Sequence, residues 1–290
     1  GPLTFLTALT LLTSLTSLSA QLTCDPVFPK TDDNVTIYYD ASKGNAALAG
    51  VSPVWAHLGV ITTLSTGPSD WKHVATTWPT NNAAAMMTLV SGNVWKKTFN
   101  IRTFFNIPAG ETVLKFACVF RNAAGTIVGR SADGGDMFYN VYPDNGPLET
   151  LLLEPVSAAF LTNIGNQIAV KGAASKLSTL SLFDNGVLVT SLSNADLLQT
   201  TLDVTSGGLH KIEFIALAGS EQDTTSFTYI VPANITAQDP PAGTELGITE
   251  LTPGSVRLAL YAPGKQIIYA IGDFNDWTPS PDQQMRRSLD

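Results

Sequence analysis

The sequence has few charged residues. Asp, Glu, Lys and Arg make up 14% of the 290 residues, against about 25% in an average domain. The 16 Lys+Arg and 24 Asp+Glu residues give a formal net charge of −8, and basic runs stop at two residues, as in Lys96–Lys97. Nucleic acids and anionic membrane surfaces bind clustered Lys and Arg. We therefore expect neither a nucleic acid partner nor an anionic membrane surface.

Residues that carry chemistry are also scarce. Three His and two Cys leave little for a Cys/His zinc site. The chain has no Gly-x-Ser-x-Gly, no His-Glu-x-x-His and no Gly-rich phosphate loop. It also lacks the repeating strand–helix pattern of a barrel, and its carboxyl pairs sit in no recognisable glycosidase motif. We expect no catalytic residue and no cofactor, so this stretch of chain is expected to be inert alone.

Residues 1–20 have the composition of a secretory signal. Leu alternates with Thr and Ser from Leu3 to Leu18, and small residues precede Gln21. The stretch is too short and too polar to predict a membrane span. The alternative is an ordinary amphipathic helix or strand. Export predicts a secreted, extracellular or cell-surface location.

An exported chain meets oxidising conditions, so a disulfide between Cys24 and Cys118 is one expectation. Period-two alternation over 113–121 puts Cys118 on one face with Leu114, Phe116 and Phe120, which we interpret as the core face. The alternative is two unlinked thiols, one of them buried.

Short apolar stretches bounded by turn residues, with no long amphipathic helix, predict an all-β fold of tandem β-sandwich domains. We divide the chain at two Pro/Gly-rich linkers. The expected parts are a signal at 1–20, a sandwich at 21–142, an immunoglobulin-like spacer at 148–233, and an incomplete sandwich at 246–290. The last part is short for a sandwich, so we expect it to be truncated.

Strand candidates follow this division. In the second part, Asp184-Asn185-Gly186 between two apolar runs predicts a tight hairpin, because Asn-Gly accepts positive φ. The remaining strand candidates are 35–39, 54–61, 94–101, 113–121 and 137–141 in the first part, 168–171, 180–183, 187–192, 211–217 and 226–231 in the second, and 256–262 and 266–271 in the third.

The segment Ala270-Ile271-Gly272-Asp273-Phe274-Asn275-Asp276-Trp277 resembles the early-set sandwich that precedes the catalytic barrel in α-amylase-type glycoside hydrolases. The strand 256–263 before it matches that family's first strand. The resemblance covers residues 249–277 and implies that Phe274 and Trp277 tuck back onto a sandwich. It also implies a catalytic domain in the same full-length chain, beyond Asp290.

The first part resembles the N-terminal domain of secreted Bacteroidetes amylases and, more loosely, starch-binding modules of the Trp/His type. The matching residues include 55–62, 70–72, 86–88 and Trp95. In such modules aromatic rings stack on glucose faces. The resemblance implies that an α-glucan polysaccharide contacts Trp55, His57, Trp71, Lys72 and Trp78.

Each of these residues also has a structural interpretation. Trp55 and His57 alternate along one strand and so share a face, which is either a groove or the core. Trp95 with Phe99 is interpreted as core, and Trp277 as structural.

Three acidic clusters have loose calcium-loop spacing, but none supplies a full ligand set, so we interpret each as a turn with calcium as the alternative. They are Asp273/Asn275/Asp276, Asp32/Asp33/Asn34/Asp40 and Asp133/Asp136.

The function predicted from the sequence is a monomeric, non-catalytic starch-binding and spacer region of an extracellular amylase-type glycoside hydrolase. The alternative is a purely structural or adhesive array of sandwiches with every Trp in a core. A hydrolase acting alone is a third class, which no motif favours.

Overall fold

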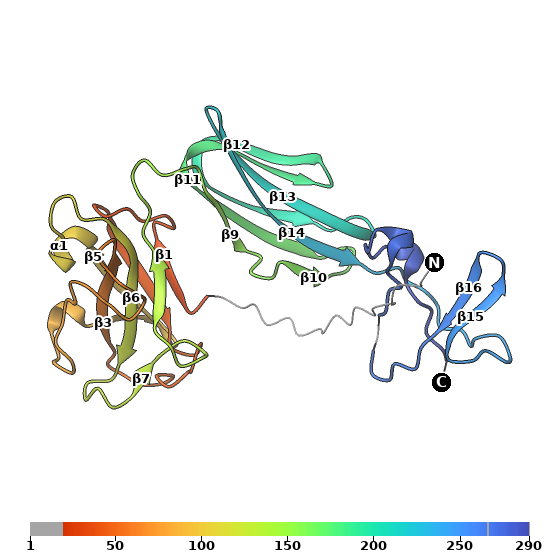
Figure 1. The fold of residues 1–290 in the computed structure, drawn as a ribbon, viewed down its shortest axis with the longest axis horizontal. Helices are drawn as coiled ribbons and strands as arrows, with labels where there is room; N and C mark the ends of the chain where they lie inside the picture. Colours follow the sequence, from red (N-terminus) through yellow and green to blue (C-terminus); the bar gives the residue numbers. More distant parts are fainter. Residues whose placement is uncertain (1–19, 266, 290) are drawn as a thin grey trace.

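The computed structural model describes residues 20–265 and 267–289. The signal expected at 1–20 therefore lies outside the described residues, apart from Ala20. The described chain consists of two β-sandwich units followed by a two-stranded hairpin (Figure 1). The all-β, tandem-sandwich fold expected from the sequence is confirmed. No helix in the described ranges is long and apolar enough to cross a membrane.

The first unit packs two sheets face to face. One sheet has the strand order β1-β2-β5-β4, and the other places β3 on one side of β6 with β7 and β8 on the other. The five strands expected in this part fall on β2, β3, β5, β6 and β8. The element bounds are β1 (Leu22–Asp25), β2 (Asn34–Asp40), β3 (Trp55–Thr62), β4 (Thr88–Ser91), β5 (Val94–Asn100), α1 (Ile101–Phe105), β6 (Val113–Arg121), β7 (Val128–Gly129) and β8 (Met137–Asn140).

The core of this unit lies between the two sheets. The rings of Tyr39 on β2 and Phe120 on β6 stack at 3.9 Å with an interplanar angle of 11°. Trp95 is buried in the same cluster, as expected. Leu114 is 41% exposed, against expectation, and Val113 is buried instead. The ladder between β3 and β6 slips at Ile61/Thr62, so alternation is lost at the start of β6.

Cys24 and Cys118 are both buried and both free, so the structure lacks the expected disulfide and corresponds to the alternative of two thiols. Cys24 belongs to β1 in one sheet and Cys118 to β6 in the other. The Sγ of Cys118 donates a hydrogen bond to the Met137 carbonyl at 3.4 Å. Burial, with Asp25 and Asp33 nearby, raises the pKa of Cys24 to about 12, and burial also raises the pKa of Cys118.

The second unit is one continuous six-stranded sheet organised around a single long strand, β11. The first part of β11 pairs with β9 and the later residues of β12, and its last residues pair with β13 and the start of β12. The ladder with β12 is irregular between Ala173 and Leu180, where the second partner of β11 changes from β9 to β13. The bounds are β9 (Thr150–Glu154), β10 (Ala159–Leu161), β11 (Gln167–Asp184), β12 (Val187–Asp203), β13 (Gly208–Ala218) and β14 (Glu221–Val231).

The hairpin expected at Asp184-Asn185-Gly186 is confirmed. It joins β11 to β12, and Asn185 and Gly186 have φ of 47° and 79°. Next to this hairpin, the His210 side chain of β13 is buried, with the residue 7% exposed. Its Nδ1 lies 2.8 Å from Asp184 Oδ2, and its ring stacks on Tyr229 at 4.5 Å. These contacts tie β11, β13 and β14 together at one end of the sandwich.

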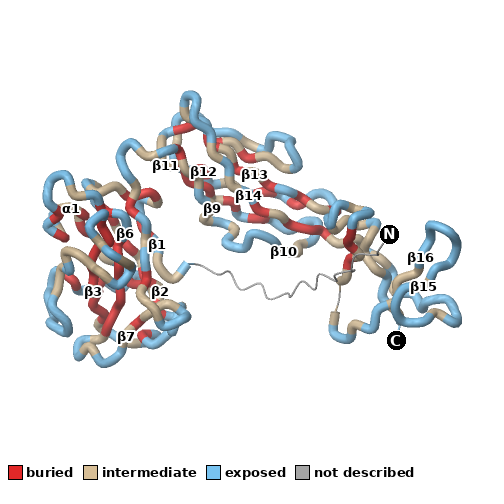
Figure 2. The backbone as a smooth tube through the Cα atoms, viewed as in Figure 1, coloured by how far each residue is buried: buried red, intermediate tan, exposed pale blue. Residues whose placement is uncertain are grey.

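The third part is a hairpin of β15 (Gly247–Thr252) and β16 (Ser255–Ala259). Figure 2 shows it as mostly exposed, in contrast with the two sandwiches. Phe274 and Trp277 are 65% and 43% exposed, so they do not tuck onto a sandwich as expected. Of the strand expected at 266–271, the described residues form an isolated bridge between Tyr269 and Gln284. In the described ranges β15 and β16 pair only with each other, so these rings have no second sheet to cover them.

Close packing between β11 and β13 in the second unit gives a stability prediction. A Cβ on Gly172 of β11 would lie 2.7 Å from the ring of buried Phe214 on β13. We expect Gly172→Ala to destabilise this unit by about 1–3 kcal/mol, because the core has no room for the methyl group. Calorimetry should show a lower transition for the second unit. Gly67→Ala is the control, since nothing lies within 4 Å of a Cβ there; equal effects of the two changes would contradict the packing.

The buried thiols give a second prediction. Because Cys24 and Cys118 are buried with raised pKa values, we expect both to resist a thiol reagent at pH 8 and to react once the first unit is unfolded in denaturant. Titration with Ellman's reagent, with and without denaturant, measures this. Two thiols missing from the denatured, unreduced protein would indicate a disulfide and contradict the structure.

Candidate carbohydrate-contacting surface

The candidate residues of the first unit meet on the outer face of the sheet that contains β3. Ala56, Leu58 and Val60 of β3 point into the core. Trp55, His57 and Gly59 alternate with them and point outward. The segment 63–87 runs along the free edge of β3. It is bonded there from Lys72 N to Val60 O at 2.7 Å and from Ala75 N to Leu58 O at 3.0 Å.

The long segment turns its aromatic side chains onto this outer face. Trp71 lies directly over Gly59, since a Cβ there would be 3.1 Å from the Trp71 ring. The ring of His57 stacks on Trp71 at 5.9 Å and meets Trp78 edge-on at 5.2 Å. His57 Nδ1 and Thr76 Oγ1 are 2.9 Å apart and share a hydrogen bond. Three of the five predicted contact residues, Trp71, His57 and Trp78, therefore form one cluster with the imidazole between two indoles. The pKa of His57 in this cluster is lowered.

The physical cause of that low pKa is burial first and the nearby guanidinium of Arg121 second, against a smaller opposing effect of Asp136. No carboxylate contacts His57 among the described residues. The cluster has the properties of a contact surface and lacks an acid–base pair at its centre.

The five predicted contact residues differ in how far their side chains are exposed to solvent. Trp78 is 39% exposed, and Trp71, His57 and Lys72 are half-buried. Trp55 is only 8% exposed, because the guanidinium of Arg121 lies over its ring at 5.7 Å and Met86 bridges to its backbone. The Trp55 ring therefore has little free surface for a sugar, which argues against this part of the expectation. Lys72 forms an ion pair with Asp70 at 2.8 Å beside Trp71.

The sequence analysis did not include Arg121 in this cluster. Arg121 is 2% exposed and also lies 5.5 Å from the Trp78 ring. Its place opposite Trp55 in the β3–β6 ladder is the signal that pairing of the two strands would have supplied.

The acidic clusters, interpreted as turns with calcium as the alternative, contact other side chains. Asp136 pairs with Arg130 and Asp32 with Arg102, and Asp273 accepts from the Trp277 indole at 2.9 Å. Across the described ranges, three or more His, Cys, Asp or Glu side chains do not gather as a metal site.

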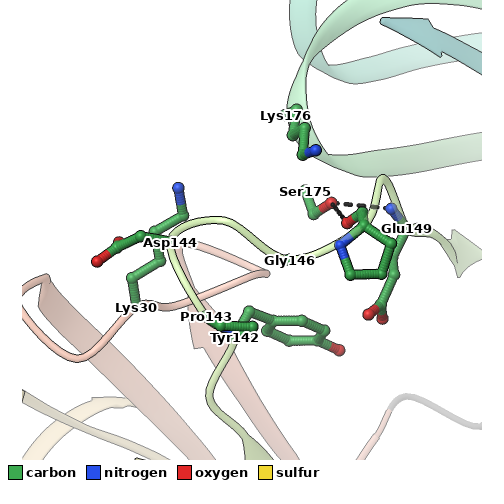
Figure 3. Close-up of a pocket in the computed structure, with 9 residues that line it drawn as sticks. Lys30, Tyr142, Pro143, Asp144, Gly146, Glu149, Ser175 and Lys176 are labelled. Atoms are coloured by element: carbon green, nitrogen blue, oxygen red, sulfur yellow. Dashed lines mark hydrogen bonds between the residues drawn. The ribbon is translucent and has the colours of Figure 1, made fainter. Parts of the chain in front are cut away.

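A small pocket lies where the first and second units meet (Figure 3). It is lined by Lys30, Tyr142 and Asp144 from one side and Glu149, Ser175 and Lys176 from the other. Its volume of about 10 Å³ holds one water at most. Ser175 Oγ accepts a hydrogen bond from Glu149 N at 2.8 Å there. The pocket is a joint between units, too small for a sugar.

The fold and this surface define a tandem β-sandwich protein. A family profile described as "Domain of unknown function (DUF8578)" matches residues 22–128, which contain the whole aromatic cluster. No curated protein matches the chain.

Solved structures give distant likenesses. The fibronectin(III)-like modules of Clostridium thermocellum CbhA are 18% identical over 29% of this chain and 96% of theirs, with a TM-score of 0.25. A titin Z1Z2 tandem chimera is 10% identical over 71% of this chain and 94% of its own, with a TM-score of 0.24. The BSP domain of a biofilm-associated protein is 10% identical, with a TM-score of 0.30, and this chain covers 28% of it. None of these likenesses bears on a ligand.

The lowered pKa of His57 predicts how stability depends on pH. His57 stays neutral in the folded unit below its ordinary pKa of 6.5, while the unfolded chain takes up the proton. We therefore expect stability of the first unit to be level above pH 6.5 and to fall as the pH drops below it. Thermal melts between pH 4.5 and 8 measure this, and His57→Gln should flatten the fall. An imidazole that titrates above 6.5 by NMR would contradict the prediction.

Proposed function

We propose that this chain is a non-catalytic region of an exported protein that acts on starch-like α-glucan, with the first unit binding the glucan. One observation carries the proposal: Trp78 is 39% exposed and stands next to half-buried Trp71 across His57. Indole rings bury large apolar area while keeping a polar N–H, which suits contact with sugar faces. No hydrogen bond of the Trp78 N–H occurs within the described ranges.

The inclination of the rings favours a curved ligand. His57 makes interplanar angles of 29° with Trp71 and 81° with Trp78. The two indole planes are therefore inclined by at least about 52°, the difference between those angles. A flat β-1,4-linked ribbon cannot stack on both rings, whereas successive faces of a helical α-glucan are inclined to each other. The Lys72–Asp70 pair offers polar groups beside Trp71.

The rest of the chain fits a spacer in this proposal. The second unit is a complete sandwich with its own core. The segment 270–277 supports the presence of an amylase-type catalytic domain elsewhere in the same polypeptide, through its resemblance to that family. A weak glucan site tethered to a hydrolase raises the local concentration of the enzyme on its polymer. An extracellular or cell-surface location belongs to the same proposal.

Affinity electrophoresis tests the binding. We expect the protein to be retarded in gels that contain soluble starch, and Trp78→Ala to weaken binding at least about tenfold, or about 1.4 kcal/mol, because the most exposed ring is lost. Trp71→Ala should act in the same direction. Retardation should be absent in gels that contain hydroxyethyl cellulose.

Trp277→Ala is the matched control, since that ring is 43% exposed and lies outside the first unit. It should bind starch like the unaltered protein. If the unaltered protein migrates equally with and without starch, the glucan proposal fails, and the structural or adhesive array becomes the supported function.

A further inference from the structure

Arg121 is a buried cation without a carboxylate partner. The side chain is 2% exposed, and no ion pair involves it in the described part of the chain. Removing a cation from water costs several kcal/mol even after relaxation. Desolvation accordingly lowers the pKa of Arg121, which nevertheless stays protonated. Because burying this cation is costly, the groups that surround the guanidinium must compensate for its lost hydration.

The guanidinium lies between two indole rings. It is 5.7 Å from the centroid of Trp55 and 5.5 Å from that of Trp78. Both distances are within the range of a cation–π contact, which strengthens when the cation is desolvated. Trp55 belongs to β3 and pairs directly with Arg121 across the ladder. Trp78 belongs to the long segment 63–87, so the guanidinium joins that segment to the sheet.

The hydrogen bonds of Arg121 go to the two loops that flank Trp78. On one side it donates to the Thr80 carbonyl and to Asn81 Oδ1 at 2.9 Å. On the other side it donates to the carbonyls of Asn122 at 2.9 Å and Ala123 at 3.2 Å. The planar fork of a guanidinium can serve these acceptors and face an indole at once, which a Lys ammonium cannot.

The second loop touches Trp78 directly. A Cβ on Gly125 would lie 2.6 Å from Pro79 and 3.3 Å from the Trp78 Nε1 atom. Gly125 has φ of 70°, and its N–H bonds to Asn122 O at 3.1 Å. Trp78 therefore contacts His57 in a T-shaped pair, with Arg121 over its ring and the 122–125 turn beside its N–H. The Trp78 side chain nevertheless remains 39% exposed.

We propose that Arg121 is a positioning residue that orients Trp78 for contact with the glucan and does not itself touch the ligand. Its effect on binding rests on the proposed function, whereas its effect on the indole does not. Arg121 holds the two loops at a fixed distance, so the inclination between Trp78 and Trp71 is set before the ligand arrives. Preorganised rings lose less conformational entropy on binding.

Arg121→Lys in 5-fluorotryptophan-labelled protein tests the proposal, because fluorine NMR reports each of the five indoles separately once Trp→Phe variants assign them. We expect the Trp78 and Trp55 resonances to shift or broaden while those of Trp95 and Trp277 stay in place. Starch affinity should fall at least tenfold. Arg130→Lys is the matched control: Arg130 is in the same unit but pairs with Asp136, and its replacement should leave Trp78 unchanged.

The outcomes separate the two proposals. If Arg121→Lys leaves the Trp78 resonance and the starch affinity unchanged, the positioning role is overturned and starch binding by the unaltered protein still stands. If the Trp78 resonance moves while even the unaltered protein ignores starch, positioning is supported and the proposed function fails.

A second variant covers the case in which Arg121→Lys unfolds the unit. Asn81→Ala removes one acceptor at an exposed position and leaves the carbonyl contacts of Arg121 in place. It should shift the Trp78 resonance by less than the Arg121 change does, with the transition of the first unit retained. A folded Asn81→Ala protein with an unmoved Trp78 resonance overturns the role.

Discussion

The pairing of β3 with β6 is the constraint on which the first unit depends. One face of this strand pair packs into the core, and the other carries the aromatic surface. Residues such as Leu58 and Phe120 point inward and build the core with the opposing sheet. Trp55 and Arg121 are opposite each other in the same ladder and point outward. A shift of one residue would exchange these sets and place a guanidinium in the core. The register that stabilises the fold therefore also assembles the aromatic surface.

The segment 63–87 covers part of the outer face of β3 and so determines which aromatic rings remain exposed there. The segment 63–87 hydrogen-bonds along β3 and lays Trp71 on Gly59. It buries Trp55, whose ring keeps little surface for a sugar, and leaves Trp78 39% exposed at the margin. The charged guanidinium of Arg121 lies at the edge of this covered region. It faces two aromatic rings and donates hydrogen bonds to loop carbonyls in place of water or a carboxylate. The exposure of Trp78 is thus a consequence of how two loops close around one cation.

Much of the strand pattern could be predicted from local sequence. The strand at 113–121 and the Asn-Gly turn at Asn185 reflect physical preferences of a few neighbouring residues, and the structure has both. The disulfide between Cys24 and Cys118, the core position of Leu114 and the burial of Phe274 and Trp277 were wrong. Each of those depends on a partner from another part of the chain: an opposing thiol, the register of β3, or a covering sheet. No local pattern contains that information.

The sequence by itself determined that this chain forms short strands with apolar faces, since side-chain alternation and turn chemistry act over a few residues. It also placed Trp55 and His57 on one face of one strand. Only the tertiary structure decided which face that is, that a distant segment brings Trp71 and Trp78 to it, and that Arg121 joins them. The physical reason is that exposure and ring contact are properties of pairs of residues far apart in the chain, fixed when the sheets and loops pack together.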